Sequence, residues 1–297
     1  MSATNVITPK RALPELSAVL ELFKPVTWFA PMWAFACGVV SVGGPDAGRL
    51  PFIVGGIMLA GPLACAASQA VNDWFDRDVD AINEPNRPIP SGRIPGCWGL
   101  YIAIFWTLLS LSVGAVLGPV AFAASCVAAA LAWAYSAPPI RLKMNGWLGA
   151  SAVGISYEGV AWVTGAAVAT SAVPGSEIYL LAFLYSLGAH GIMTLNDFKA
   201  VEGDRRMGIK SLPVTLGVQR AAFVAIAAML VPQGIVALWL TQTQGVVFGA
   251  VILALIGLQI LFARRLISNP AKYAPWYNQT GVSLFVLGMM VSAIAVN

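Results

Sequence analysis

Four aspartates fall within eight residues of one another in the segment NDWFDRDVDAINEPNRPIPSGRI, positions 72–94. If this segment begins as a helix, Asn72, Asp76 and Asp80 are spaced four residues apart and share one face, with Asp73 on the neighbouring edge. Carboxylates stacked at this spacing repel one another at neutral pH, and burial increases the repulsion. The pattern therefore requires cations close to this helix end.

A second acidic segment, NDFKAVEGD at positions 196–204, resembles the first. Both begin Asn-Asp-aromatic and place an aspartate eight residues after the asparagine, and RPIPSG downstream of the first is echoed by KSLPVTLG downstream of the second. On a continuous helix Asp197 and Asp204 share a face, whereas Glu202 lies off it unless Gly203 loosens the turn. The echo predicts two similar helical units facing one central site.

Oxygen ligands without histidine or cysteine favour a hard cation, Mg²⁺ above all, which shares its coordination with substrate phosphates. The sequence therefore predicts a magnesium-diphosphate site. The candidate metal ligands are Asp73, Asp76, Asp80, Asp197, Glu202 and Asp204. Arginine and lysine would bind the diphosphate, and the candidates are Arg87, Arg93, Arg141, Lys143 and Lys210. For each of these the alternative is the ordinary basic charge of a cytoplasmic loop. Asp78 lies off the shared face, and we expect it to pair with Arg77 or water.

The elements that must position these residues are membrane helices. The chain is 58% apolar and only 10% charged, with a mean hydropathy of +0.77, whereas soluble domains carry about 25% charged residues. We therefore predict an all-α polytopic membrane protein with a cytoplasmic tail at 1–16 and one nine-helix transmembrane domain at 17–297. The surroundings we expect are membrane lipid, with no nucleic-acid partner. The nine predicted spans lie near 17–42, 51–75, 98–117, 119–137, 147–170, 177–196, 219–241, 246–264 and 278–296.

Basic residues set the predicted orientation. With nine spans, sixteen of the seventeen lysines and arginines fall on one face, and Arg49 is the exception. Since cytoplasmic loops carry the excess of basic charge, the pattern predicts a cytoplasmic N-terminus and a C-terminus on the opposite side. Nearly all the acids gather on the same face, which indicates a central cavity open to the cytoplasmic side.

A diphosphate inside a membrane bundle suggests a lipid whose leaving group is diphosphate. Ionisation of an allylic C–O bond generates a carbocation; a metal stabilises the departing diphosphate and an aromatic face can stabilise the cation. Tyr135 is the candidate catalytic aromatic, alongside the catalytic set Asn72, Asp76, Asp80, Asp197 and Asp204. Packing is the alternative role for Tyr135, as it is for Trp28, Trp74, Trp133 and Trp162.

The pattern NDxxDxxxD, from Asn72 to Asp80, followed by a second acidic motif after the sixth predicted span, resembles the UbiA superfamily of intramembrane prenyltransferases. Within it, NDWFDRDVDAINEPNRPIPSGRIPG, YSAPPIRLKMNGW, GAHGIMTLNDFKAVEGDRRMGIKSLPV and PWYNQTGVSLFVLGMM resemble the (bacterio)chlorophyll-synthesising branch, with AHGIMTLND closer to its bacteriochlorophyll side. The resemblance runs from about Leu22 to the C-terminus. Many superfamily members carry aspartate where this chain has Ala200, so either Asp197 or Glu202 must complete the second motif.

This resemblance implies nine helices around a central cavity and Mg²⁺-dependent transfer of a geranylgeranyl or phytyl group from its diphosphate. The implied acceptor is the propionate carboxylate of bacteriochlorophyllide, which is already ionised at pH 7, so no general base is needed. The implied location is the cytoplasmic membrane, inner or intracytoplasmic and photosynthetic. Other pigment-biosynthesis proteins are possible partners.

Two intramembrane polar residues are further substrate-binding candidates. His190 is the only histidine and lies seven residues before Asp197; it is a packed histidine, a ligand or hydrogen-bond donor to the pigment, or a residue that tunes the diphosphate site. Glu158 lies inside the fifth predicted span, where an ionisable residue is a functional candidate by default.

Three alternatives remain for the activity: chlorophyll synthesis, quinone or haem prenylation within the same superfamily, and cation-coupled transport. Paired repeats with intramembrane acids fit a transporter, but its acids should lie near the membrane midplane. Here the acids cluster at helix ends, which favours the transferase.

Overall fold

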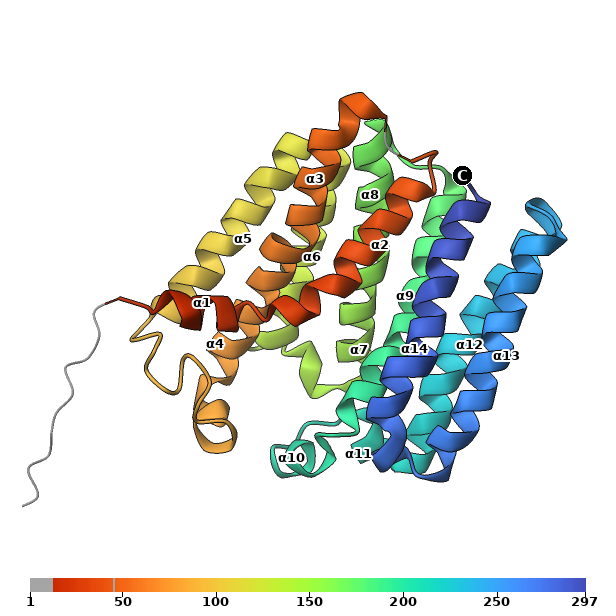
Figure 1. Cartoon of the computed structure of the whole chain (residues 1–297). Coiled ribbons are helices and arrows are strands. Elements are labelled where there is room, and N and C mark those ends of the chain that lie inside the picture. The colour runs from red at the N-terminus through yellow and green to blue at the C-terminus, as the bar shows by residue number, and fades with distance from the viewer. Residues whose placement is uncertain (1–12, 45) are drawn as a thin grey trace, which may run out of the picture.

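The computed structural model describes residues 13–44 and 46–297, and within them every regular element is helical (Figure 1). The all-α prediction is therefore confirmed for the described chain. The predicted N-terminal tail lies mostly outside the described residues, which begin at Leu13; the first helix, α1, begins at Leu16.

Eight stretches of the described chain are long and apolar enough to cross a membrane. They are Ala47–Asn83, Trp98–Leu117 (α5), Pro119–Ser136 (α6), Gly146–Thr170, Ser176–Asp197 (α9), Val218–Thr243 (α12), Val246–Ser268 (α13) and Pro270–Ala295 (α14). Seven predicted spans begin or end within a few residues of these helices, and α14 begins eight residues before its predicted span.

The first predicted span, 17–42, is not one helix. It divides into α1 (Leu16–Leu22), the 3₁₀ turn η1 (Pro25–Trp28) and α2 (Phe29–Val40). The break falls at Lys24, whose φ of 45° is left-handed and which precedes a proline, a residue that disfavours helical backbone before it. In consequence α1 lies across the bundle axis (Figure 1), and α2 has only 12 residues.

The second span is longer than predicted because its helix continues past the apolar run. α3 (Leu50–Met58), the π-helical segment η3 (Leu59–Cys65) and α4 (Ala66–Asn83) are continuous. Pro62 lies inside η3, where the wider turn accommodates a residue without an N–H. The polar end of α4 thus carries the first acidic motif beyond the apolar part of the same helix.

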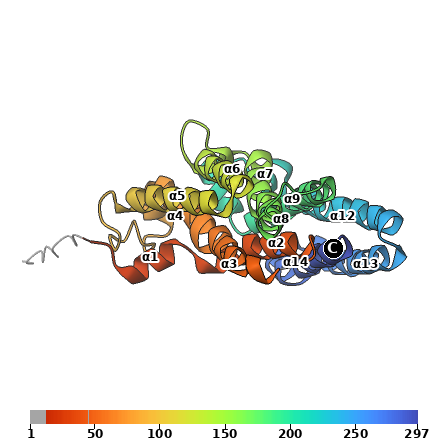
Figure 2. The ribbon, with the colours of Figure 1, turned by 90° about the horizontal axis from the view of Figure 1, so that it is seen from above.

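The fifth span also contains a π-helical segment. α7 (Gly146–Gly154) leads through η5 (Ile155–Val160) into α8 (Ala161–Thr170). In the view down the bundle, α3, α2, α14 and α13 form one row and α5, α6, α7–α8, α9 and α12 form the other (Figure 2).

Small residues let the two rows approach closely. A Cβ on Gly165 of α8 would lie 2.0 Å from the carbonyl oxygen of Phe35 on α2, and a Cβ on Gly38 would lie 2.0 Å from the carbonyl oxygen of Trp162. Backbone contact through glycine is the usual means by which membrane helices pack without a hydrophobic driving force between them.

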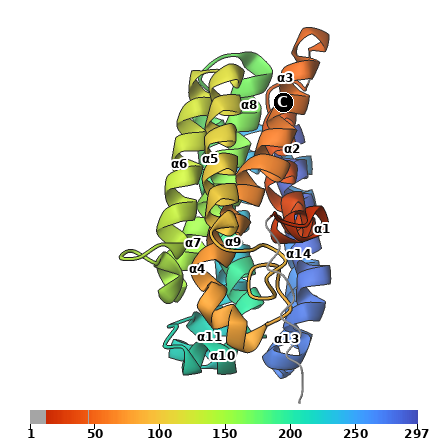
Figure 3. The same cartoon turned by 90° about the vertical axis from the view of Figure 1, so that its left-hand side faces the viewer.

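One end of the bundle gathers the polar segments. α10 (Val201–Arg206) and α11 (Leu212–Leu216) lie at the same end as the last turns of α4 and the loop after it (Figure 3). The C-terminus lies at the other end (Figure 1). This arrangement brings the two acidic segments, which are far apart in sequence, to one end of the molecule.

Candidate active site

A cavity of about 470 Å³ lies between α4, α6, α7–η5 and α9, with η1 and α2 closing its remaining side. Asn72 and Asn196, the first residues of the two acidic motifs, both line it, as does Tyr135. Most of its other lining residues are apolar. We call this cavity the chamber; it has polar groups from both motifs and an apolar interior.

The face of α4 predicted from the spacing is present, and each of its residues has a defined partner. Asn72 Nδ2 donates to Ser136 Oγ at 3.2 Å. Asp76 accepts a hydrogen bond from Lys143 and has Arg141 Nη2 3.6 Å away. These two contacts tie the end of α4 to the end of α6 and to the loop that follows it.

Arg87, in the loop after α4, pairs with carboxylates of that helix. Arg87 Nη1 lies 2.8 Å from Asp80 Oδ2 and 3.6 Å from Asp73 Oδ1, and its other nitrogens bind Glu84. Asp80 is buried. Through Arg87, the RPIPSG loop therefore supplies the positive charge that balances Asp80 and Asp73. An arginine in this position is also expected of a site that binds a diphosphate.

Asp73 and Asp78 differ from the rest of the cluster. Asp73 is buried and bound by Lys24, which the sequence reasoning did not single out, at 2.7 Å. Asp78 is exposed, and its nearest cation is Arg77 at 3.8 Å, in agreement with its predicted position off the shared face.

The second motif is not on one helix, contrary to the spacing argument. α9 ends at Asp197, the chain turns through 198–200, and α10 begins at Val201. Asp197 and Asp204 nevertheless remain within electrostatic range of each other. Burial raises the pKa of Asp204, which lies beyond the membrane helix. The turn, rather than a helical repeat, brings these two carboxylates together.

Glu202 points away from this pair. It is exposed and bound to Arg206 at 3.0 Å, with Arg205 at 3.9 Å. Among the described residues, neither Asp197 nor Asp204 forms an ion pair with lysine or arginine. Asp197 and Glu202 therefore have different surroundings, since Glu202 is the one that is exposed and paired with arginine.

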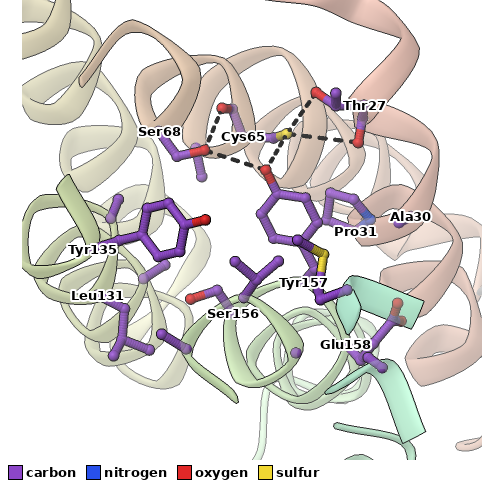
Figure 4. A pocket seen from close by; sticks show the side chains of 18 of the residues that line it. Thr27, Ala30, Pro31, Cys65, Ser68, Leu131, Tyr135, Ser156, Tyr157 and Glu158 are labelled. Carbon is purple, nitrogen blue, oxygen red and sulfur yellow. Dashed lines mark hydrogen bonds between the residues drawn. The ribbon is translucent and has the colours of Figure 1, made fainter. Parts of the chain in front are cut away.

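Tyr135 lies between the two motifs. Its hydroxyl is within electrostatic range of the carboxylates of Asp197, Asp76 and Asp204. Its ring faces the chamber (Figure 4). Tyr135 is thus within electrostatic range of carboxylates from both motifs. Trp162, by contrast, is fully buried and bonded to Ser41, which is a packing role.

Of the five basic candidates, Arg87, Arg141 and Lys143 lie close to the carboxylates of the first motif, and Arg93 and Lys210 do not. Burial lowers the pKa of Lys143, and the neighbouring carboxylate of Asp76 opposes that shift. Arg93 binds Glu21 of α1 at 2.7 and 3.0 Å and so holds the loop after α4 against α1. The side chain of Lys210 is exposed.

The backbone of Lys210 has a clear structural role. Its N–H donates to the Met144 carbonyl at 3.0 Å, and Gly146 donates to the Lys210 carbonyl at 2.9 Å. This short parallel bridge fastens the loop that carries Arg141 and Lys143 to the segment after Asp204. The basic loop and the second acidic motif thus form one rigid edge of the site.

Inside the membrane part, the two further candidates are buried. Glu158 lies in η5, lines the chamber, and has no hydrogen-bond partner for Oε2 among the described residues. His190 lies on α9 and does not line the chamber; it faces a second hollow on the other side of α7 and η5. Glu158 and His190, both predicted from the sequence to bind substrate, therefore line two different hollows.

Sequence reasoning missed a polar network on the chamber wall. Tyr157 Oη lies 3.2 Å from Cys65 Sγ and 3.3 Å from Ser68 Oγ (Figure 4). Gln69 Nε2 lies 3.1 Å from the same oxygen. Tyr157 belongs to η5 and Cys65 to η3, so the network joins the two π-helical segments. Only tertiary structure brings these segments together, and no spacing in either one indicates the contact.

Asn278 of α14 was also missed. Its Nδ2 donates to Asn196 Oδ1 at 2.8 Å, which joins the last helix to the first residue of the second motif. The segment PWYNQTGVS is part of the family resemblance, but the spacing of its residues does not indicate a contact with Asn196.

The acidic side chains fit a hard cation by their chemistry, since all the donors are oxygens. Within residues 13–44 and 46–297, no three His, Cys, Asp or Glu side chains converge on one point. The first motif is balanced by lysine and arginine, whereas Asp197 and Asp204, which lie within electrostatic range of each other, form no such ion pair among the described residues. The second motif is therefore the part of the site best suited to accept added positive charge.

The sequence is similar to those of known proteins. It matches the UbiA prenyltransferase family over residues 24–295. The chain belongs to this family. It is a UbiA prenyltransferase with two acidic motifs at one end of a helical bundle, as the sequence resemblance predicted.

Curated relatives and solved structures agree with this assignment. The chain is 52% identical to the bacteriochlorophyll synthase 33 kDa chain of Cereibacter sphaeroides, over 99% of this chain and 97% of that protein. It is 52% identical to the corresponding Rhodobacter capsulatus protein, over 100% and 98%, and 37% identical to chloroplastic chlorophyll synthase of Avena sativa, over 93% and 75%.

Two solved structures share the fold. One, of digeranylgeranylglyceryl phosphate synthase, has a TM-score of 0.74 at 20% identity and covers 94% of this chain and 98% of that chain. The other, a UbiA homolog from Archaeoglobus fulgidus bound to GPP and Mg²⁺, has a TM-score of 0.69 at 21% identity, with coverage of 94% and 96%.

Proposed function

We propose that this UbiA prenyltransferase transfers a geranylgeranyl or phytyl group from its diphosphate to the propionate carboxylate of bacteriochlorophyllide. The observation that carries the proposal is the 52% identity to a bacteriochlorophyll synthase chain along nearly the whole length of both proteins. The higher identity to the bacteriochlorophyll relatives than to chlorophyll synthase, at 37%, supports bacteriochlorophyllide as the acceptor.

The chamber is the proposed site of the prenyl donor. Its volume of about 470 Å³ lies within the range of roughly 300–1,000 Å³ of ligand pockets, and its apolar interior suits an isoprenoid chain. Asn72, Asn196 and Tyr135 mark the polar end of the chamber, where the diphosphate would lie. Lys143, Arg141 and Arg87 would then bind its oxygens, each exchanging a carboxylate partner for phosphate.

The proposed metal ligands are Asp76 and Asp80 on α4 and Asp197 and Asp204 from the second motif. When bound, Mg²⁺ supplies electrostatic stabilisation of the leaving diphosphate. The solved relative that binds GPP together with Mg²⁺ supports this choice of ion. We assign Asp73 a positioning role through Lys24, and Glu202 no contact with the ion.

In the proposed reaction the bond between C1 of the prenyl chain and the diphosphate oxygen breaks, and its electron pair leaves with the diphosphate. A propionate oxygen forms the new C–O bond, and no proton is transferred. The protein therefore needs no general base. Its task is to orient the two reacting atoms and to keep water from the allylic cation, while the ring of Tyr135 faces the developing charge.

The proposed topology places the acidic end in the cytoplasm. The short segment from η1 through α2, residues 25–40, serves as a ninth crossing, which gives a cytoplasmic N-terminus and a C-terminus on the far side. Residues 17–297 then form one transmembrane domain. The basic excess of the loops at the acidic end supports this orientation, and the membrane proposed is the cytoplasmic or intracytoplasmic photosynthetic membrane.

The test is esterification by the purified protein in lipid nanodiscs with geranylgeranyl diphosphate, Mg²⁺ and bacteriochlorophyllide. We expect an esterified pigment, loss of turnover with EDTA and recovery with added Mg²⁺. Chlorophyllide and a quinone precursor in parallel reactions measure acceptor selectivity. Absence of ester from bacteriochlorophyllide, with turnover of another acceptor, would overturn the proposal in favour of a different branch of the family. Unchanged turnover in EDTA would exclude the metal.

A further inference from the structure

A second hollow, which we call the outer groove, lies on the side of α7–η5–α8 opposite the chamber. Its volume is about 900 Å³, and its walls are α6, α7–η5–α8, α9 and α12. Its lining is almost entirely apolar. The exceptions are Trp147, Ser151, Tyr179, Ser186 and His190.

His190 is the distinctive residue of the outer groove. It is 7% exposed, its Nδ1 lies 3.2 Å from Ser151 Oγ, and its ring stacks on Trp147 with centroids 5.4 Å apart and planes at 23°. Its Nε2 is buried and has no hydrogen-bond partner within residues 13–44 and 46–297. A buried imidazole nitrogen without a partner is unfavourable unless a ligand completes it.

The environment of His190 is that of a metal-binding imidazole. A metal-ligating histidine usually donates its other ring N–H to an oxygen, which fixes the ring and leaves the second nitrogen free to bind the metal. Ser151 Oγ is such an oxygen. Trp147, which is 51% exposed, adds a flat aromatic surface beside the ring. A flat, apolar ligand with a metal at its centre fits these features together.

The chamber leaves little room for a second substrate. At about 470 Å³ it is near the lower end of ligand pockets, and the proposed prenyl chain already fills an apolar cavity of that size. The outer groove has about twice that volume. A large planar acceptor therefore fits in the groove and not beside the donor.

Three helical segments, α6, α7–η5 and α9, line both hollows. Residues next to each other in sequence line opposite sides: Ser151 faces the groove and Ala152 the chamber, and His190 faces the groove and Ala189 the chamber. His190 also lies two helical turns from Asp197, roughly 10 Å along α9. A side arm on the edge of a macrocycle bound beside His190 would therefore have to span a distance of about this size to reach the diphosphate end of the chamber.

We propose that the outer groove binds the magnesium macrocycle of the acceptor, with His190 Nε2 as the axial ligand of the pigment's magnesium ion. Trp147 packs beside the ring, and the propionate reaches toward the diphosphate end of the chamber. This inference rests on the proposed function for the identity of the acceptor.

The test is optical titration of the full-length protein in nanodiscs with bacteriochlorophyllide, without prenyl diphosphate, alongside its magnesium-free counterpart. We expect wild type to bind the magnesium pigment with the spectral signature of axial coordination. His190→Phe should lose that signature and bind at least tenfold more weakly. The magnesium-free pigment should bind wild type and His190→Phe alike. Equal affinity and an unchanged coordination signature in His190→Phe would overturn the proposal.

Two variants away from His190 keep the test independent of folding at that residue. Ala123 is exposed and lines the groove, so Ala123→Trp should raise the KM for bacteriochlorophyllide at least fivefold and leave the KM for prenyl diphosphate unchanged. Phe122 is also exposed but lies outside the groove, and Phe122→Trp is the matched control with neither change. If wild type forms the ester while Ala123→Trp and Phe122→Trp have the same acceptor KM, the groove assignment fails and the proposed function stands. If wild type forms no ester, the proposed function itself fails.

Discussion

Lys24 donates a hydrogen bond from Nζ to Oδ1 of Asp73 at 2.7 Å, and this contact joins the break between α1 and η1 to the middle of α4. Asp73 is 2% exposed, whereas the side chain of Lys24 is 27% exposed. The pair thus fixes the first segment of the bundle against the helix that carries the acidic motif.

Removal of this lysine should destabilise the fold. Lys24→Met leaves the buried carboxylate of Asp73 with only Arg87 at 3.6 Å, and we expect a loss of about 2 kcal/mol, less than for a fully buried pair because Lys24 reaches solvent. Thermal unfolding in detergent measures it. The double variant Lys24→Met, Asp73→Asn should recover most of the loss, and strictly additive losses would show that the pair is not coupled.

The second acidic motif should depend on Asp197 and not on Glu202. Asp197→Asn should lower kcat by about 100-fold and raise the Mg²⁺ concentration needed for half-maximal rate, since a ligand to the ion is lost. Glu202→Gln should stay within about twofold of wild type, because Glu202 is exposed and bound to Arg206. The readout is esterification rate against Mg²⁺ concentration. A reversed order of the two variants would return Glu202 to the metal site.

Lys143 should bind the prenyl diphosphate donor rather than the acceptor. It is bound to Asp76, and a charge-assisted bond to diphosphate contributes about 1.5–3 kcal/mol. Lys143→Met should therefore raise the KM for geranylgeranyl diphosphate by about 10- to 100-fold, with partial recovery in Lys143→Arg. Initial-rate kinetics with each substrate varied in turn separates the two constants. A rise confined to the acceptor KM would contradict the assignment.

Close packing of α2 on α8 should be intolerant of a single methyl group. Gly165→Ala places a Cβ 2.0 Å from the Phe35 carbonyl oxygen, which forces the two helices apart, and we expect about 2 kcal/mol or more of destabilisation. Gly257→Ala is the matched control, because no atom lies within 4 Å of its added Cβ and alanine is the better helix former. Detergent-unfolding temperatures compare the two. Similar values for both variants would show that the contact is not a tight one.

The sequence predicted the class of fold, most helix ends and the face shared by Asn72, Asp76 and Asp80, because all of these depend on local periodicity and apolar length. It did not predict the break at Lys24, although Pro25 disfavours helical backbone at the residue before it, because apolar residues flank this pair on both sides. It placed Asp197 and Asp204 together for the wrong reason, since the chain turns between them.

The spacing of residues in the sequence could not predict which distant side chains bind the acidic motifs and the chamber wall. Lys24, Tyr157 and Asn278 reach the site from segments 49, 88 and 82 residues away from their partners Asp73, Gln69 and Asn196. Contacts of this kind follow from how the helices pack, and a single sequence has no periodic signal for them. The choice between Asp197 and Glu202 likewise depended on which side chain turns outward to an arginine.

The π-helical segment η5 shifts the phase of the helix that separates the chamber from the outer groove. A wider turn holds one more residue than an α-helical turn over the same rise, so α8 is rotated by about 100° relative to an unbroken continuation of α7. An ordinary α-helix with the same number of residues between 155 and 160 would turn α8 by that angle. Gly165 and Trp162 would then no longer face α2, although the sequence would be unchanged. The π-helical segment η5, and not regular helical geometry, thus sets the orientation of α8 relative to α7.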